Sequence, residues 1–152
     1  MKEICINLNE KYHRPMISLY NKLTLIDTGA IIPVVSMNKI VLDILFNAKL
    51  LKDNISIGGF GGGRATGGIY SLSNFCIKNF HFKTLECFVP HEPSKDFSII
   101  LSAPLFYDTD YEFKPREHKF IIKVSEDKIL NNEFFIKDVK TKICVQINDV
   151  LL

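Results

Sequence analysis

The sequence lacks a long apolar run, a strong excess of charge and any closely spaced pair of cysteines. No apolar run reaches the roughly 18 residues that a bilayer-spanning helix needs, so we expect no membrane partner. A formal net charge of +2 gives no global reason to expect binding to nucleic acid. The start, MKEICINLNEKYHRP, has charges inside its only apolar patch and does not look like a signal peptide, so we expect a cytoplasmic protein.

The residues that most often bind metals are scattered along the chain. The cysteines are Cys5, Cys76, Cys87 and Cys144, and the histidines are His13, His81, His91 and His118. The cysteines form no C-x-x-C pair, which favours reduced thiols over disulfides or a zinc site. The histidines also lack the spacing of metal ligands. We therefore expect neither a metal nor a cofactor.

The chain has the size and the composition of one globular domain, with 152 residues of which 47% are hydrophobic and 24% charged. Most of it is typical of short strands. The predicted strands are residues 3–8, 16–20, 23–26, 55–57, 69–73, 75–77, 80–82, 85–89, 98–101, 120–124, 134–136 and 143–147. Asn21 and Lys22 are the expected hairpin turn between two of them. The apolar run 31–35 contains Pro33, which predicts an edge strand or a bend.

One segment has a different period. In residues 38–51, apolar side chains recur at helical spacing, and Asn38 is suited to cap the first turn. The apolar positions are Ile40, Val41, Ile44, Leu45, Ala48 and Leu51. The sequence therefore predicts a mainly β domain with one helix over residues 38–51.

Seven of the eight glycines fall between residues 58 and 68, in GGFGGGRATGG. The flanking segments are strand-like, so the pattern predicts a long, mobile hairpin. A phosphate-binding loop is the first rival, because Gly58 and Gly63 have the spacing G-x-x-x-x-G. However, Arg64 and Ala65 stand where such a loop needs Lys and Ser or Thr, and the predicted helix precedes the loop instead of following it.

The eighth glycine follows an acid. Leu25 and Ile26 lead into Asp27, and Thr28 and Gly29 continue as a tight turn. A carboxylate delivered by two apolar residues is expected to be partly buried, which is costly unless it is hydrogen-bonded or protonated. Alone, Asp-Thr-Gly is usually just a turn.

In this setting the sequence resembles the retropepsins, the aspartic peptidases of retroviruses and their cellular relatives. Residues 25–30 match the signature in which two hydrophobic residues precede Asp-Thr-Gly-Ala. Residues 57–63, IGGFGGG, resemble the glycine-rich flap that closes over substrate, and residues 99–101 resemble a late apolar segment behind the active site. The likeness covers about residues 14–106.

The resemblance implies a retropepsin-like closed β-barrel, one acid-protease half, with one helix, a glycine-rich flap hairpin and a C-terminal β extension. We expect a single domain over residues 1–152, with its core at about 14–106 and an appendage at 107–152. It also implies an aspartic endopeptidase that acts on a peptide or protein substrate. The implied catalytic residues are Asp27, Thr28 and Gly29. The implied substrate-binding residues are Ala30, Ile31, Ile32, Gly58, Gly59, Phe60 and Gly61.

This chemistry needs two carboxylates, and the chain supplies one. Asp108 and Asp110 flank Thr109 without the glycine, so they are no second copy of the motif. A homodimer is therefore expected, in which a two-fold axis brings two Asp27 side chains together. Ala30 stands where pepsin-like enzymes commonly carry a hydroxyl beside the carboxylate. Its lack of a donor predicts an activity optimum in the mildly acidic range.

Three positions depart from the family pattern. Ser102 occupies the place of a late glycine, and its side chain could crowd the Asp27 loop. Ile31 and Ile32 occupy places where viral members carry acids that hold the substrate backbone. These departures leave open a non-catalytic module of the same fold that dimerises or binds peptides, and also an unrelated β domain with a chance motif.

Overall fold

The computed structural model describes residues 2–9, 15–58, 63–93, 97–107, 109–125 and 134–140, together with 129–130. The described part is mainly β with one α-helix, as predicted. The strands are β1 (Lys2–Asn7), β2 (Met16–Leu19), β3 (Lys22–Asp27), β4 (Val34–Val35), β5 (Lys49–Gly58), β6 (Arg64–Ile77), β7 (Phe80–Pro90), β8 (Ile99–Ser102), β9 (Asp110–Lys114), β10 (Lys119–Val124), β11 (Ile129–Leu130) and β12 (Phe134–Val139). The helices are α1 (Lys39–Phe46) and the 3-10 turns η2 (Ala103–Phe106) and η3 (Pro115–Glu117). None of the described helices has the length and apolarity required to cross a bilayer.

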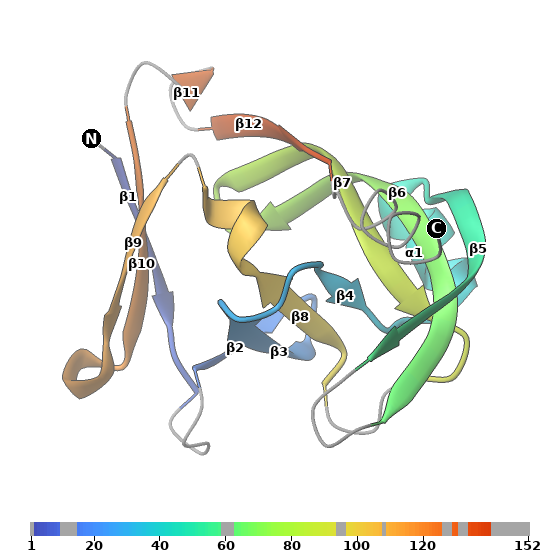
Figure 1. Ribbon diagram of the computed structural model, residues 1–152. Helices are drawn as coiled ribbons and strands as arrows, with labels where there is room; N and C mark the ends of the chain where they lie inside the picture. Colours follow the sequence, from blue (N-terminus) through green and yellow to red (C-terminus); the bar gives the residue numbers. More distant parts are fainter. Residues whose placement is uncertain are drawn as a thin grey trace.

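Two sheets organise these strands (Figure 1). The larger has the order β11-β12-β7-β4-β8-β3-β2, and β6 pairs with both β7 and β5. The smaller has the order β1-β10-β9 and stands to one side of the larger sheet in Figure 1. In the larger sheet β3 pairs with β8 in parallel, and β4 lies between β8 and β7. These central strands position the candidate site.

The predicted hairpin between β2 and β3 is present, but its turn lies one residue earlier than predicted. Tyr20 and Asn21, with φ of 53° and 59°, form the two-residue turn, and Leu19 pairs with Lys22. Positive φ at both central positions is the geometry that joins two twisted strands without splaying them. The predicted turn at Asn21 and Lys22 was therefore wrong by one position, because Lys22 already belongs to the ladder.

Pro33 marks a bend, as expected, and the strand after it is not at an edge. β4 pairs with β7 on one side and with β8 on the other. Pro33 precedes β4, so its missing N–H removes no ladder bond. Its carbonyl accepts a hydrogen bond from the Phe88 N–H at 2.9 Å. The edge alternative is thus wrong, and the bend is confirmed.

The helix begins where it was predicted and ends early. The Asn38 side chain accepts a hydrogen bond from the Ile40 N–H at 2.8 Å, which confirms the N-cap. Asn47 adopts φ 47° and ψ 53°, a left-handed conformation that terminates helices. β5 begins at Lys49, so the predicted extension to residue 51 was wrong.

The buried residues of α1 are not among the apolar positions from which the helix was predicted. Leu42 and Phe46, one helical turn apart, are buried, whereas Ile40 and Ile44 are 68% and 77% exposed. The Phe46 ring packs against Phe75 at a centroid distance of 5.4 Å. The helix packs mainly on β6, and the Phe46 ring also contacts Tyr20 in the turn after β2, so only a narrow stripe of α1 is buried. The apolar spacing alone did not identify this stripe.

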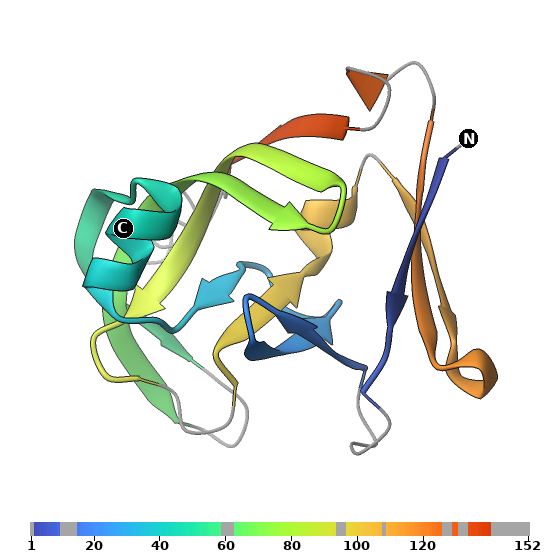
Figure 2. The same ribbon diagram turned by 180° about the vertical axis from the view of Figure 1, so that it is seen from behind.

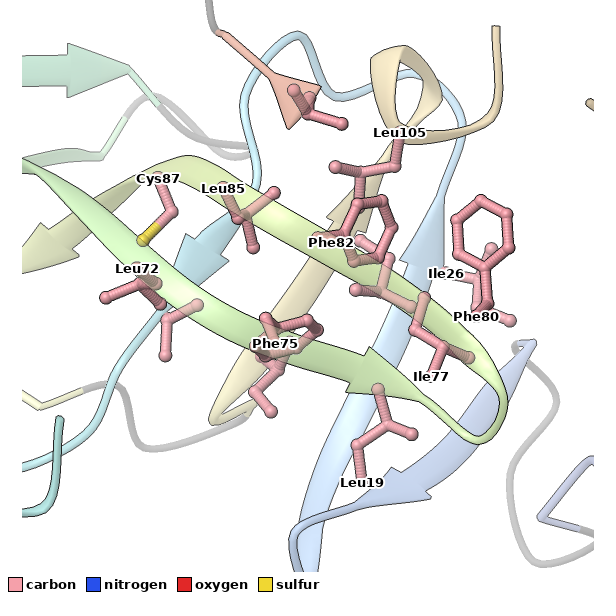
Figure 3. Packing of buried hydrophobic residues seen from close by; sticks show 14 of the residues in the cluster. Leu19, Ile26, Leu72, Phe75, Ile77, Phe80, Phe82, Leu85, Cys87 and Leu105 are labelled. Atoms are coloured by element: carbon pink, nitrogen blue, oxygen red, sulfur yellow. The ribbon is translucent and has the colours of Figure 1, made fainter. Parts of the chain in front are cut away.

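The main core lies between the curved strands β6 and β7 and their neighbours (Figure 3). Segments predicted as separate short strands are continuous in β6 and β7, joined by a turn in which Lys78 has φ 51°. The buried aromatic side chains Phe75, Phe80 and Phe82 follow this hairpin, and each contributes about 2–3 kcal/mol by its burial.

The segment after residue 106 adds to the same core. Phe120, Ile122 and Val124 of β10 join Ile4 and Ile6 of β1 in the main cluster. The predicted strands 120–124 and 134–136 are confirmed as parts of β10 and β12, β9 was missed, and the predicted strand 143–147 lies outside the described residues.

The described cysteines carry free thiols. Cys5 is exposed, Cys76 is half-buried and Cys87 is buried. Desolvation raises the pKa of the Cys76 and Cys87 thiols, which keeps them protonated and poorly nucleophilic near neutral pH. Cys144 lies outside the described residues.

Two glycines of the glycine-rich segment serve packing, not mobility. A Cβ on Gly67 would lie 2.2 Å from the Val89 carbonyl oxygen, and one on Gly68 would lie 2.9 Å from a methyl group of Leu50. Gly67 pairs with Pro90 and Gly68 with Val89, so β7 and β5 can close on β6 only because these positions have no side chain.

This geometry gives a stability prediction. Gly67→Ala should lower the free energy of unfolding by roughly 2–4 kcal/mol, because the backbone of β7 must move to admit the methyl group. Gly63→Ala is the matched control, since a Cβ there meets nothing within 4 Å. The control should change stability by less than about 0.5 kcal/mol. Urea unfolding monitored by circular dichroism measures both, and equal stability of the two variants would contradict the packing role.

Candidate functional site

Asp27 is the last residue of β3 and opens a tight turn. The Gly29 N–H donates to Asp27 Oδ1 at 3.0 Å, and the Ala30 N–H donates to the Asp27 carbonyl at 3.1 Å. A Cβ on Gly29 would lie 3.3 Å from Asp27 Oδ1, which is a tight contact. The absence of a side chain at this position therefore leaves room for the hydrogen bond from the Gly29 N–H. The turn thus fixes one carboxylate oxygen and leaves the half-buried side chain able to interact with a further group.

The side chains of β3 alternate between two faces of the sheet. Ile26 points into the main core, where its parallel partner Leu101 is also buried. Asp27 and its partner Ser102 therefore project from the opposite face. This alternation explains how a carboxylate can follow directly after a core residue.

A ladder of apolar side chains crosses five strands on the Asp27 face. Strand register joins Leu25 to Ile100, Ile100 to Val34, Val34 to Phe88, and Phe88 to Ile69. Paired residues share a face, so these side chains follow one face of the sheet away from Asp27. Leu25, Phe88 and Ile69 are buried on that face, whereas Val34 and Ile100 are half-buried. We call this set the apolar ladder.

The two isoleucines after Ala30 have different environments. Ile31 is 60% exposed, whereas Ile32 is buried in a second cluster with Ile55, Ile69 and Phe88. Val34 and Ile57 pack against this cluster and stay half-buried. Of the predicted substrate-binding residues near Asp27, Ile31 is therefore on the surface, and Ile32 anchors the end of the apolar ladder.

The glycine-rich segment connects two strands of a hairpin, as predicted. β5 and β6 pair up to Gly58 and Arg64, and the Arg64 Nε donates to Ser56 Oγ at 3.1 Å. In Figure 1 β5 and β6 run side by side along the right-hand side of the molecule. Gly58 ends β5, whereas the predicted contacts Gly59, Phe60 and Gly61 lie outside the described residues.

A histidine and an aspartate link the base of this hairpin to the end of β7. His91 Nε2 lies 2.9 Å from Asp53 Oδ1, and the His91 N–H donates to the Thr66 carbonyl at 2.9 Å. The His91 hydrogen bond, together with one from the Asn54 N–H, lowers the pKa of the Asp53 carboxyl. Sequence reasoning missed this pair, because 38 residues separate its members and no local pattern joins them.

A cavity of about 320 Å³ lies beside His91. Its lining combines apolar and polar side chains from the start of α1 and the segment before it, from β6, and from the end of β7 and the residues that follow it. The lining residues are Ser36, Met37, Asn38, Lys39, Tyr70, Val89, Pro90, His91 and Pro93. Asp27 is not among them, so the cavity is separate from the carboxylate turn.

Ser102 is the most unusual residue near Asp27. Its side chain is fully buried, and its hydroxyl has no hydrogen-bond partner among the described residues. An unsatisfied buried hydroxyl costs about 1–3 kcal/mol, so such groups are rare in native proteins. In the sequence, Ser102 was notable only because it stands in the place of a family glycine. Strand pairing shows that it lies beside Asp27.

Comparison with known proteins supports the fold. No family model and no curated protein matches the sequence. Among solved structures, a retropepsin-like aspartic protease from Rickettsia conorii aligns with a TM-score of 0.50 and 17% sequence identity, over 80% of this chain and 89% of that chain. This likeness establishes a mainly β, retropepsin-like fold, which was predicted from the sequence.

The His91–Asp53 pair gives a pH prediction. The pKa of Asp53 is lowered in the folded protein, so the pair stabilises the fold above the ordinary aspartate pKa and loses this effect as pH falls through the lowered value. Asp53→Asn should therefore be less stable than the wild type at pH 6, and the gap should shrink at pH 3. Urea midpoints at both pH values measure it. A gap of the same size at pH 3 would show that Asp53 does not contribute through its charge.

Proposed function

We propose that this chain is an aspartic endopeptidase that acts as a homodimer and hydrolyses peptide bonds through a water activated by two Asp27 carboxylates. One observation carries the proposal: Asp27 ends β3 in a tight turn that holds its Oδ1 by the Gly29 N–H. This turn belongs to a chain whose fold is similar to that of a retropepsin-like aspartic protease.

Two carboxylates divide the chemistry of hydrolysis. The ionised Asp27 of one copy takes a proton from water as general base, and the protonated Asp27 of the other donates to the carbonyl oxygen of the scissile bond as general acid. Because two negative charges so close together repel strongly, the pair shares one proton and titrates as a unit. Metal and cofactor have no part in the proposed mechanism.

The neighbouring residues take supporting roles by resemblance. Thr28 would join the two turns across the dimer axis through its hydroxyl, and Gly29 would present its backbone to the substrate. Ala30 and Ile31 would flank the substrate chain, with Ile31 exposed enough to contact it. In the proposed site, Gly58–Gly61 would form the part of the flap that closes over the substrate, with Phe60 at its tip.

Half-buried apolar side chains indicate the kind of peptide that would fit. Val34, Ile57 and Ile100 are only partly covered, and they belong to the apolar ladder or pack at its end. Such a surface favours apolar side chains near the scissile bond, since these gain most from leaving water. We therefore propose a protein or peptide substrate with apolar residues next to the cleaved bond.

A non-catalytic module of the same fold is the second candidate, and Ser102 favours it. The serine adds a side chain beside Asp27 where the resemblance expects a glycine. Such a module would still dimerise or bind peptides. Catalysis itself separates the two candidates.

Substitution of Asp27 provides the test. Asp27→Asn should lower turnover of a peptide library by at least roughly 10³-fold, because an amide can act neither as base nor as acid. Asp110→Asn is the matched control, because Asp110 is exposed at the start of β9 and should be dispensable. A peptide that contains statine should inhibit the wild type. Turnover retained by pure Asp27→Asn, or absent from the wild type, would contradict the proposed function.

A further inference from the structure

Ser102 directly precedes η2, yet it does not cap this turn. A capping serine accepts a hydrogen bond from a backbone N–H two or three residues ahead. No such bond forms at Ser102, and Pro104 has no N–H to offer. The ordinary explanation for a serine before a helical turn therefore does not apply, and its buried hydroxyl needs another partner.

Strand pairing places a candidate acceptor beside it. Ser102 and Asp27 are register partners in neighbouring parallel strands, so their side chains project side by side from one face. Asp27 Oδ1 accepts the Gly29 N–H, and an ionised carboxylate has capacity for several further donors. Rotation about χ1 would re-aim the Ser102 hydroxyl toward this carboxylate.

We infer that Ser102 is a positioning residue for Asp27, whose hydroxyl donates a hydrogen bond to the Asp27 carboxylate and holds it in its working orientation. That this orientation serves catalysis rests on the proposed function. Ser102 would then support the Asp27 carboxylate instead of only crowding its turn.

Among the described residues, the strands next to Asp27 carry few charged groups. The strands that flank β3, which are β2 and β8, carry no titratable side chain, and Lys22 is at the far end of β3. On β12, the buried Lys137 donates its Nζ to the Leu105 carbonyl of η2 at 3.0 Å. Ser102 is thus the side-chain donor that β8 places in register with Asp27.

Position 30 allows a test of whether a hydroxyl there can replace the hydroxyl of Ser102. The Ala30 N–H donates to the Asp27 carbonyl at 3.1 Å, which holds residue 30 in the turn that begins at Asp27, but its methyl group cannot donate. If Ser102 already supplies the hydroxyl, a serine at position 30 adds little in the wild type. The same serine should replace the lost bond when residue 102 is alanine.

The first experiment is a titration of the Asp27 carboxyl by NMR in aspartate-labelled protein, with the signal assigned by Asp27→Asn. A donor to the ionised form favours charge, so Ser102→Ala should move the titration midpoint to higher pH by about half a unit to one unit. Thr24→Val is the matched control. It removes a buried hydroxyl from the other face of β3, where Thr24 Oγ1 donates to the Lys22 carbonyl, and should leave the midpoint unchanged.

The second experiment combines the substitutions. Ala30→Ser in the Ser102→Ala background should return the midpoint to its wild-type value, and Ala30→Ser alone should shift it less. The pH–rate profile should move in parallel. A midpoint that is unchanged in Ser102→Ala, or that moves to lower pH, would overturn the inference even if the wild type cleaves peptides. Absence of cleavage by the wild type would instead refute the proposed function, because the NMR titration does not depend on turnover.

Discussion

The parallel pairing of β3 with β8 is the constraint on which the candidate site depends. It sets Ile26 against Leu101 in the main core and Asp27 against Ser102 on the other face. A shift of one residue in this register would exchange the two faces and send the carboxylate into the core. The core side chains of β3 and β8 thus hold Asp27 in place as well as stabilising the fold. Figure 2 shows these central strands from behind, between the small sheet and the β6–β7 hairpin.

The second constraint is close packing around β6. Gly67 and Gly68 allow β7 and β5 to approach it, and Ile55 and Ile57 of the hairpin pack at the end of the apolar ladder. The pair of His91 and Asp53 then ties the base of the hairpin to the end of β7. This contact and the two glycines together fix how β5, β6 and β7 pack on one another.

Local patterns in the sequence predicted what depends on neighbouring residues. The turn at Asp27, the cap at Asn38 and the strands on either side of the glycines all follow from such patterns. The buried face of α1 does not follow from a local pattern, because the sheet beneath the helix determines that Leu42 and Phe46 are buried. The position of Ser102 beside Asp27 and the His91–Asp53 pair were not predicted, because both depend on contacts between segments far apart in sequence. The roles of Asp27, Thr28 and Gly29 in catalysis stay predictions.

The central claim is that one active site needs an Asp27 from each of two copies, and mixing tests it directly. Wild type and Asp27→Asn are unfolded together, refolded at fixed total concentration and assayed over a range of ratios. If both carboxylates are required, activity should fall with the square of the wild-type fraction, to about a quarter at an equal mixture. A linear fall, to about one half, would show that each chain acts alone and would contradict the account.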